Sequence, residues 1–176
     1  MKRFFYALPI IFVASMSPAI ADNGDLKIKT VKNMYNSAIK SSRNGQDEDT
    51  LDTLFKYADR NLQNAVALSR ISRMSDDGMD LSECHSAYET LIINPSNGFS
   101  IDEAQNINYK LLDNGKVRAS VKYTSEYTGT KDFSLQCSSG SCKITDVLES
   151  DGYSGKSNAE KSVSYTHLTL PTNREV

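Results

Sequence analysis

The stretch that decides the fold is residues 106–148, NINYKLLDNGKVRASVKYTSEYTGTKDFSLQCSSGSCKITDVL. Apolar and polar residues alternate along four runs in it, and successive side chains on a β-strand point to opposite faces. Turn-forming segments separate the runs, at residues 113–115, 128–130 and 138–141. We therefore expect an antiparallel four-stranded meander with one covered apolar face and one wet polar face. The expected apolar face carries Ile107, Tyr109, Leu111, Val117, Ala119, Val121, Tyr123, Phe133, Leu135, Cys137, Cys142 and Ile144.

Two irregular features accompany this meander. The alternation breaks at Val147 and Leu148, which indicates either a β-bulge or the end of the strand. Cys137 and Cys142 flank the last turn, so they face each other across the hairpin and are expected to form a disulfide. The third cysteine, Cys84, leaves two other single bridges open, to either partner, and proximity in sequence favours the hairpin bridge. A redox or metal pair usually has a Cys-x-x-Cys spacing, which is absent here.

The first 21 residues have the pattern of a secretory signal. Lys2 and Arg3 form a basic start, residues 4–13 form an apolar core too short to span a bilayer, and Ala19-Ile20-Ala21 matches an A-x-A cleavage site. We expect cleavage after Ala21 and a location in a bacterial periplasm, where a structural disulfide is stable. Past residue 21, no apolar run is long enough to cross a membrane.

The end of the chain is interpreted as foreign. Residues 163–172, VSYTHLTLPT, resemble the in-frame translation of a transposase-based sequencing adapter. We therefore expect residues 163–176 to be read-through from a truncated gene fragment, and residues 22–162 to form a single domain. The whole chain has a formal net charge of −2, and its basic residues do not cluster with interleaved aromatic ones. Nucleic acid is accordingly not an expected partner.

The region before the meander has helical periodicity. A first helix is expected with an apolar face from Ile28 to Ile39, a start near Asp25 and a stop at Asn44-Gly45. Its lysines are interpreted as a solvated face. Two further apolar faces are expected, and Asp59 is expected to cap the second of them. They consist of Leu51, Leu54 and Phe55, and of Leu62, Ala65, Val66 and Ser69. Helices covering the apolar side of the sheet make an α+β domain.

Few residues are candidates for catalysis or for ligand binding. An acidic segment, predicted to be a solvated loop or a contact surface for a basic partner, contains Asp76, Asp77, Asp80 and Glu83. His85, beside Cys84, lacks the spacing of a metal site, and no cofactor is expected. Acids on strand ends, Asp132 and Asp146, are candidates for a general base. The candidate lining of a pocket between helices and sheet is Tyr109, Tyr123, His85 and Asp146.

The order of these elements, and the last hairpin, resemble the nuclear transport factor 2-like superfamily. Residues 140–147, GSCKITDV, stand where an uncharacterised branch of small exported bacterial proteins commonly has Gly-x-Trp-Lys-Ile-Asp-Asp-Ile. Cys142 replaces the tryptophan and Thr145 the first aspartate. The resemblance covers residues 26–148 and implies a curved, cone-like sheet wrapped around a helix, with a conical pocket. The superfamily includes isomerases and dehydratases, and also many non-catalytic binding domains.

Two functions from different classes follow. The first is a non-catalytic periplasmic binding domain for a protein or a small apolar molecule, for example an immunity protein that blocks a toxin. The alternative is a small lyase or isomerase that uses a pocket carboxylate. Two or more polar groups directed at one acid in a pocket would favour the enzyme, and a filled interior would favour binding.

Overall fold

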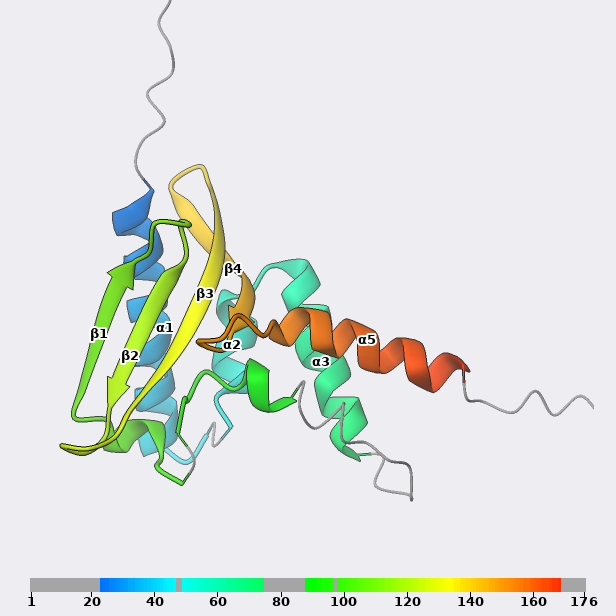
Figure 1. Ribbon diagram of the computed structural model, residues 1–176, viewed down its shortest axis with the longest axis horizontal. Coiled ribbons are helices and arrows are strands. Elements are labelled where there is room, and N and C mark those ends of the chain that lie inside the picture. The colour runs from blue at the N-terminus through cyan, green and yellow to red at the C-terminus, as the bar shows by residue number, and fades with distance from the viewer. Residues whose placement is uncertain (1–22, 47–48, 75–87, 97, 169–176) are drawn as a thin grey trace, which may run out of the picture.

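The computed structural model describes residues 23–46, 49–74, 88–96 and 98–168, and of residues 71–74 and 162–168 it describes the backbone alone. Within this part of the chain, helices precede a four-stranded antiparallel sheet and one helix follows it (Figure 1). The predicted α+β class is therefore confirmed. The helices are α1 (Gly24–Arg43), α2 (Leu51–Tyr57), α3 (Arg60–Met74), η1 (Ile101–Glu103, a 3-10 helix) and α5 (Gly155–Leu168). The strands are β1 (Asn106–Leu111), β2 (Val117–Lys122), β3 (Thr128–Ser138) and β4 (Ser141–Leu148).

The sheet has the order β1-β2-β3-β4, as the meander predicts. Helix α1 runs behind it along β1 and β2, while α2, α3 and α5 gather beyond β4 (Figure 1). Helix α5 was not predicted as a helix, and its residues 163–168 belong to the segment interpreted as read-through. It extends away from the sheet beside α3. None of the described helices is both long and apolar enough to span a bilayer.

Helix α1 buries the predicted face. Val31, Tyr35 and Ala38 have no exposed surface, and neither does Met34, which the sequence analysis omitted. Asp25 lies in the first turn instead of capping the helix, because Asn23 occupies the N-cap. The helix ends at Asn44 as predicted.

The cap predicted at Asp59 is present at the start of α3. The backbone N–H of Leu62 donates to Asp59 Oδ1 at 2.8 Å, which satisfies an amide that the first turn of a helix leaves without a partner. The α3 face, Leu62, Ala65, Val66 and Ser69, is buried. The prediction for Phe55 is wrong, since this side chain is 40% exposed. In this seven-residue helix, the buried side chains are Leu51, Thr53 and Leu54, and Tyr57 packs partly against the core.

The irregularity predicted near the end of the sheet is a β-bulge. Ser134 pairs with Asp146 and Leu135 pairs with Ile144, so Thr145 has no partner residue on β3. The extra residue shifts the alternation by one position. Ile144 and Val147 are both fully buried for this reason, although they are three positions apart.

The turn predicted at residues 128–130 is wrong. The chain turns at residues 123–127, and Gly129 lies inside β3, paired with Val121. A Cβ atom at Gly129 would overlap the Pro95 carbonyl oxygen and lie 2.8 Å from Pro95 Cβ. Glycine is needed here for the close approach of the loop around Pro95, and not for a turn.

The two edges of the sheet differ. Beside β4, Ala58 forms a bridge with Ile144, Asp59 N–H donates to the Ile144 carbonyl oxygen at 2.8 Å, and Ser154 forms a bridge with Leu148. In the described part of the chain nothing pairs with the outer side of β1. The β4 edge is therefore covered by the chain itself, and β1 is a free edge.

Candidate functional site

The predicted disulfide is present. Cys137 and Cys142 are bonded across the β3–β4 hairpin, where they are also paired in register. The turn between them is tight, with Ser139 and Gly140 at φ angles of 50° and 80°. Two consecutive positive φ angles are typical of a type I′ turn, whose twist suits a hairpin. The disulfide therefore lies on the sheet and holds its last hairpin closed.

The predicted acidic contact surface lies outside the described residues. It comprises Asp76, Asp77, Asp80 and Glu83. His85, one of the four candidate pocket residues, lies outside them as well. The other three candidates are Tyr109, Tyr123 and Asp146, and the structure places all of them.

The sheet separates these three residues. Tyr109 pairs with Ala119 on the covered face, and Tyr123 continues the same inward row and is only 3% exposed. Asp146 pairs with Ser134, whose side chain points to the other face because its neighbour Phe133 points inward. The structure therefore does not bring Asp146 together with the two tyrosines. The β-bulge that follows Ile144 sets this orientation.

Asp146 instead holds the start of α5. Its Oδ2 accepts a hydrogen bond of 2.7 Å from the Ser154 hydroxyl, and its Oδ1 accepts one of 3.2 Å from the Lys156 amide. The Ser154 hydroxyl in turn accepts from the Ser157 amide at 3.0 Å. A carboxylate at this position stabilises the unpaired amides of a helix N-terminus.

The space between α1 and the sheet is filled with aromatic side chains. The Tyr35 ring makes edge contacts with Tyr109 and Phe133, at centroid distances of 6.0 and 5.9 Å. The Tyr35 hydroxyl donates to the Ile93 carbonyl oxygen at 2.8 Å. Burial raises the pKa of Tyr35, and it also raises the pKa of Tyr109 and of Tyr123. All three therefore remain neutral phenols well above neutral pH.

A buried lysine lies on the covered face of the sheet. Lys131 pairs with Ala119, is 2% exposed, and donates to the Thr90 carbonyl oxygen at 3.0 Å and the Glu89 carbonyl oxygen at 3.3 Å. Its third contact is an ion pair with the Glu149 carboxylate. Burial lowers the pKa of Lys131, and the hydrogen bond to Glu149 opposes that shift. An ammonium group has three donors, so these three acceptors account for all of them.

The sequence contains a signal for Lys131 that the analysis missed. Lys131 is two positions before Phe133, and counting inward positions back from Phe133 assigns it to the covered face. The turn wrongly predicted at residues 128–130 ended the strand too early for that count.

Asp132, the other candidate base, is engaged on the outer face. Its two carboxylate oxygens accept hydrogen bonds of 2.7 and 2.8 Å from Nε and Nη2 of Arg118. The two residues are paired in register on β3 and β2. This hydrogen bond raises the pKa of Arg118. Such a two-pronged pair fixes both side chains and engages both carboxylate oxygens of Asp132.

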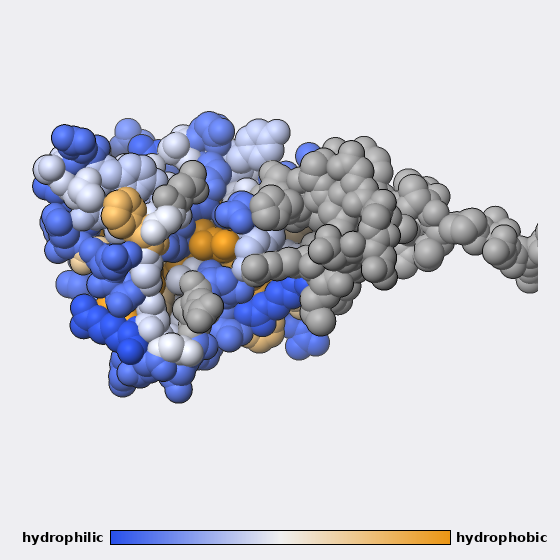
Figure 2. All heavy atoms as spheres, turned by 90° about the horizontal axis from the view of Figure 1, so that it is seen from below, coloured by the Kyte–Doolittle hydropathy of each residue, from blue (hydrophilic) through white to orange (hydrophobic). Residues whose placement is uncertain are grey.

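An aromatic patch, formed by Phe99, Tyr123 and Tyr127, lies where the β2–β3 connection meets the loop before η1. The Phe99 and Tyr123 rings stack with centroids 5.3 Å apart, and Tyr127 lies 6.0 Å from both. Tyr123 is buried, whereas Phe99 and Tyr127 are 36% and 37% exposed. Figure 2 shows the molecule from below Figure 1, with small separate hydrophobic patches on a mainly hydrophilic surface.

Polar contacts hold the aromatic patch in place. The Tyr127 hydroxyl donates to the Pro95 carbonyl oxygen at 2.8 Å, and the Tyr123 hydroxyl donates to Asn94 Oδ1. The same Asn94 side chain donates from Nδ2 to the Phe99 carbonyl oxygen at 2.8 Å. The Asn94 oxygen thus links the loop to Tyr123, while its amide nitrogen joins two parts of the same loop. These hydrogen bonds position Tyr123, Tyr127 and the backbone of Phe99 relative to one another.

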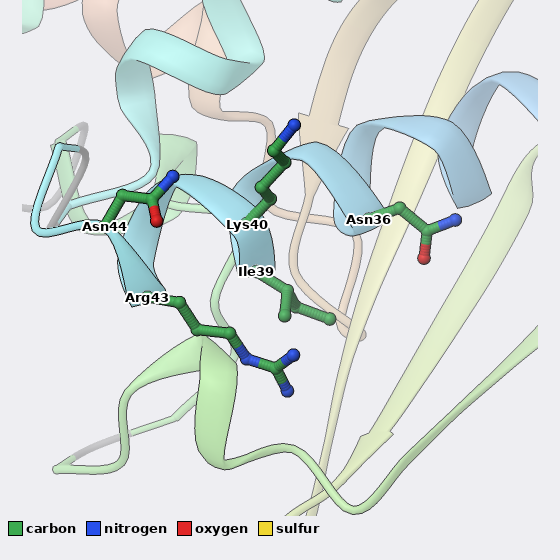
Figure 3. A pocket seen from close by; sticks show the side chains of 5 residues that line it. All are labelled: Asn36, Ile39, Lys40, Arg43 and Asn44. Carbon is green, nitrogen blue, oxygen red and sulfur yellow. The ribbon is translucent and has the colours of Figure 1, made fainter.

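A second feature at this end is a hollow on the flank of α1 (Figure 3). It has a volume of about 310 Å³ and is lined by Asn36, Ile39, Lys40, Arg43 and Asn44. All five belong to the last turns of α1 and its C-cap, and the side chains of Ile39 and Arg43 project to the same side of the helix. Two cations, two amides and one aliphatic side chain suit an anionic ligand with an apolar portion.

The loop that carries Phe99 is tied to the end of α1. The Ser42 hydroxyl lies 2.9 Å from the Ser100 hydroxyl and donates to Asp102 Oδ1 at 2.8 Å. These hydroxyls, Ser100 first and then Ser42, lower the pKa of Asp102, and Arg43 contributes in the same direction. The aromatic patch and the hollow therefore lie on segments in direct contact.

Comparison with known proteins gives no relative. No family model, no curated protein and no solved structure matches this chain. Within the described residues, no group of three or more His, Cys, Asp or Glu side chains is arranged to hold a metal ion. The function must therefore be argued from the sites themselves.

Proposed function

We propose that the protein is a non-catalytic binding domain whose aromatic patch holds a protein partner or a small apolar molecule. The observation that carries this proposal is the exposure of Phe99 and Tyr127, at 36% and 37%, in a patch that hydrogen bonds hold rigid. Aromatic side chains contribute large contact area for little conformational entropy, and they are enriched at the centres of interfaces. A rigid patch also avoids the cost of ordering its rings on binding.

The lyase or isomerase alternative loses its strongest candidate for a base. It requires a carboxylate beside other polar groups in a pocket, and Asp146 instead accepts two hydrogen bonds at the start of α5. Lys131 is the most deeply buried cation among the described residues, and its ammonium protons are all donated. A base or nucleophile needs a free lone pair, which Lys131 in this state does not present.

The proposal extends to the location of the protein and to the family to which it belongs. A disulfide between Cys137 and Cys142 is compatible with an oxidising compartment, which supports the proposed signal at residues 1–21 and a periplasmic location. Helices followed by an antiparallel meander are compatible with membership of the nuclear transport factor 2-like superfamily. Cone-like curvature of the sheet is part of the same proposal.

The experiment is a selection on the purified chain with a phage-displayed peptide library and an array of small apolar compounds. Ligands selected on the wild type are then measured against the Phe99→Ala/Tyr127→Ala double variant. We expect a loss of at least about tenfold in affinity, since aromatic anchors at interfaces contribute about 2 kcal/mol or more. The matched control is Tyr153→Ala, because Tyr153 is 60% exposed and lies outside the patch.

Ligands that bind the double variant as tightly as the wild type would place the binding surface elsewhere. Circular dichroism of each variant checks that the fold is intact. We expect it to be intact because Tyr123, the buried member of the patch, is unchanged. Turnover of a selected compound, rather than simple binding, would contradict the non-catalytic proposal.

A further inference from the structure

The free edge of β1 presents a row of backbone groups without a strand partner. Leu112 donates to Lys116 across the hairpin at 2.8 Å, so this pair is a hydrogen-bonded one. Alternation along an antiparallel ladder then directs the backbone groups of Asn106, Asn108 and Lys110 toward β2. Those of the intervening residues, Ile107, Tyr109 and Leu111, point away from the sheet.

A basic flank of α1 runs along the helix. It comprises Lys29, Lys32, Asn36, Lys40 and Arg43, which recur every three or four positions and so share one side of the helix. All five side chains are exposed. Among the described residues, none forms an ion pair with the four cations. Asp102 is the acid that faces Arg43, and its carboxylate is already engaged by two hydroxyl groups.

The basic flank and the free edge lie on the same side of the molecule. Helix α2 also packs against α1, and its Tyr57 hydroxyl donates to the Asn33 carbonyl oxygen at 3.2 Å. The Tyr35 ring contacts Tyr109 of β1. Ile39, about one helical turn further along α1, lines the hollow. Figure 1 shows α1 lying behind β1 and β2, on the covered face of the sheet.

We propose that this edge binds an acidic protein segment in extended conformation, which pairs with β1 as a fifth strand. Its backbone would take up the hydrogen-bonding groups of Ile107, Tyr109 and Leu111. Side chains on one face of the added strand would reach the hollow, with carboxylates near Arg43 and Lys32 and apolar groups near Ile39. Strand addition at a free edge is a common mode of peptide recognition, in which side chains supply the specificity.

The positive charge of the basic flank and the outward backbone groups of β1 together indicate an acidic polypeptide as the ligand. Cations alone would attract any polyanion, whereas a row of unpaired amides and carbonyls is recognised by another polypeptide backbone. This surface shares no residue with the aromatic patch, so the inference does not depend on the function proposed above.

The test measures binding of a fluorescent peptide of about eight residues with the repeat Glu-Glu-Val-Val, which places both Glu and Val on each face of a strand and is within the usual length of one. Fluorescence anisotropy is recorded with the full chain at low salt. We expect the Lys32→Glu/Arg43→Glu double variant to bind at least about tenfold more weakly. The matched control, Lys56→Glu/Arg60→Glu, makes the same change in charge on α2 and α3, and should stay within about twofold.

A second peptide separates strand pairing from simple attraction. It carries the same side chains but is N-methylated at every second residue, which removes donors while leaving the charge unchanged. We expect at least about a tenfold loss of affinity for this peptide. Equal binding of the two peptides, no binding of the first, or equally strong competition by inorganic polyphosphate would overturn the proposal.

Discussion

Lys131 forms an ion pair with Glu149, and the same ammonium group joins the covered face of the sheet to the segment around Thr90. Only 3% of the Lys131 side chain is exposed, against 38% of the Glu149 side chain. The lysine therefore bears most of the cost of burial, while the glutamate keeps contact with water. A charge in this position is tolerated because every donor of the ammonium group has an acceptor.

Replacing this lysine should destabilise the fold. In Lys131→Met the carbonyl groups of Glu89 and Thr90 lose a donor, and we expect the free energy of unfolding to fall by about 1–3 kcal/mol. Urea denaturation followed by circular dichroism measures it. Lys122→Met, on the exposed outer face of β2, is the control and should change stability by less than about 0.5 kcal/mol. Equal stability of the two variants would show that the Lys131 contacts contribute nothing.

Asp146 should act as a structural cap of α5. Asp146→Ala removes the acceptor for Ser154 and Lys156, and we expect a loss of about 0.5–2 kcal/mol in unfolding free energy. Asp146→Asn keeps an acceptor oxygen and should lose less. Denaturation of the three proteins in parallel decides the matter, and an Asn variant as unstable as the Ala variant would argue against capping.

Gly129 should not tolerate a side chain. In Gly129→Ala the new methyl group meets the carbonyl group of Pro95, and the loop that carries Phe99 must move or the strand must bend. Overpacking of this kind costs about 1–3 kcal/mol. Thr130→Ala on the same strand has no such contact and should cost less than about 1 kcal/mol. Thermal unfolding of both variants compares them directly, and similar losses would mean that the loop yields freely.

The disulfide should contribute modestly to stability. A closed loop this short is worth about 2 kcal/mol in the chain-entropy account, so Cys137→Ser/Cys142→Ser should fold but melt earlier. Thiol labelling in denaturant gives an independent check. The sequence has 3 cysteines, so the unreduced wild type should label only at Cys84, and the reduced protein should label at all 3. Three labelled thiols before reduction would exclude the bridge.

Alkaline pH should unfold the protein through its buried tyrosines. The pKa of Tyr35, Tyr109 and Tyr123 is raised in the folded state, so the unfolded chain releases these protons first. Their contribution to stability is complete below a pH of about 10 and is lost as the pH rises above it. Phenolate absorbance should show a late phase that coincides with loss of the circular dichroism signal. Tyr35→Phe should shrink that phase, and a late phase that precedes unfolding would contradict the assignment.

Periodicity in the sequence was sufficient for much of the fold. The alternation in residues 106–148 predicts the strands, and helical spacing predicts that Val31, Tyr35 and Ala38 are buried together. The Gly129 turn was predicted wrongly because glycine fits both a turn and a tight contact, and sequence alone does not distinguish them. The aromatic patch was not predicted either, because Phe99 comes from a loop without periodicity and meets Tyr123 and Tyr127 only after folding.

The sequence by itself determined most of the strands and the helices that precede them, where α3 is capped, and which two cysteines meet, because each of these depends on neighbours along the chain. Only the tertiary structure decided that Asp146 and Tyr109 lie on opposite faces, that Lys131 finds three acceptors, and that α1 packs against the free-edge strand β1. These relationships join residues far apart in sequence. They depend on a bulge, a loop approach and a helix orientation that local patterns do not encode.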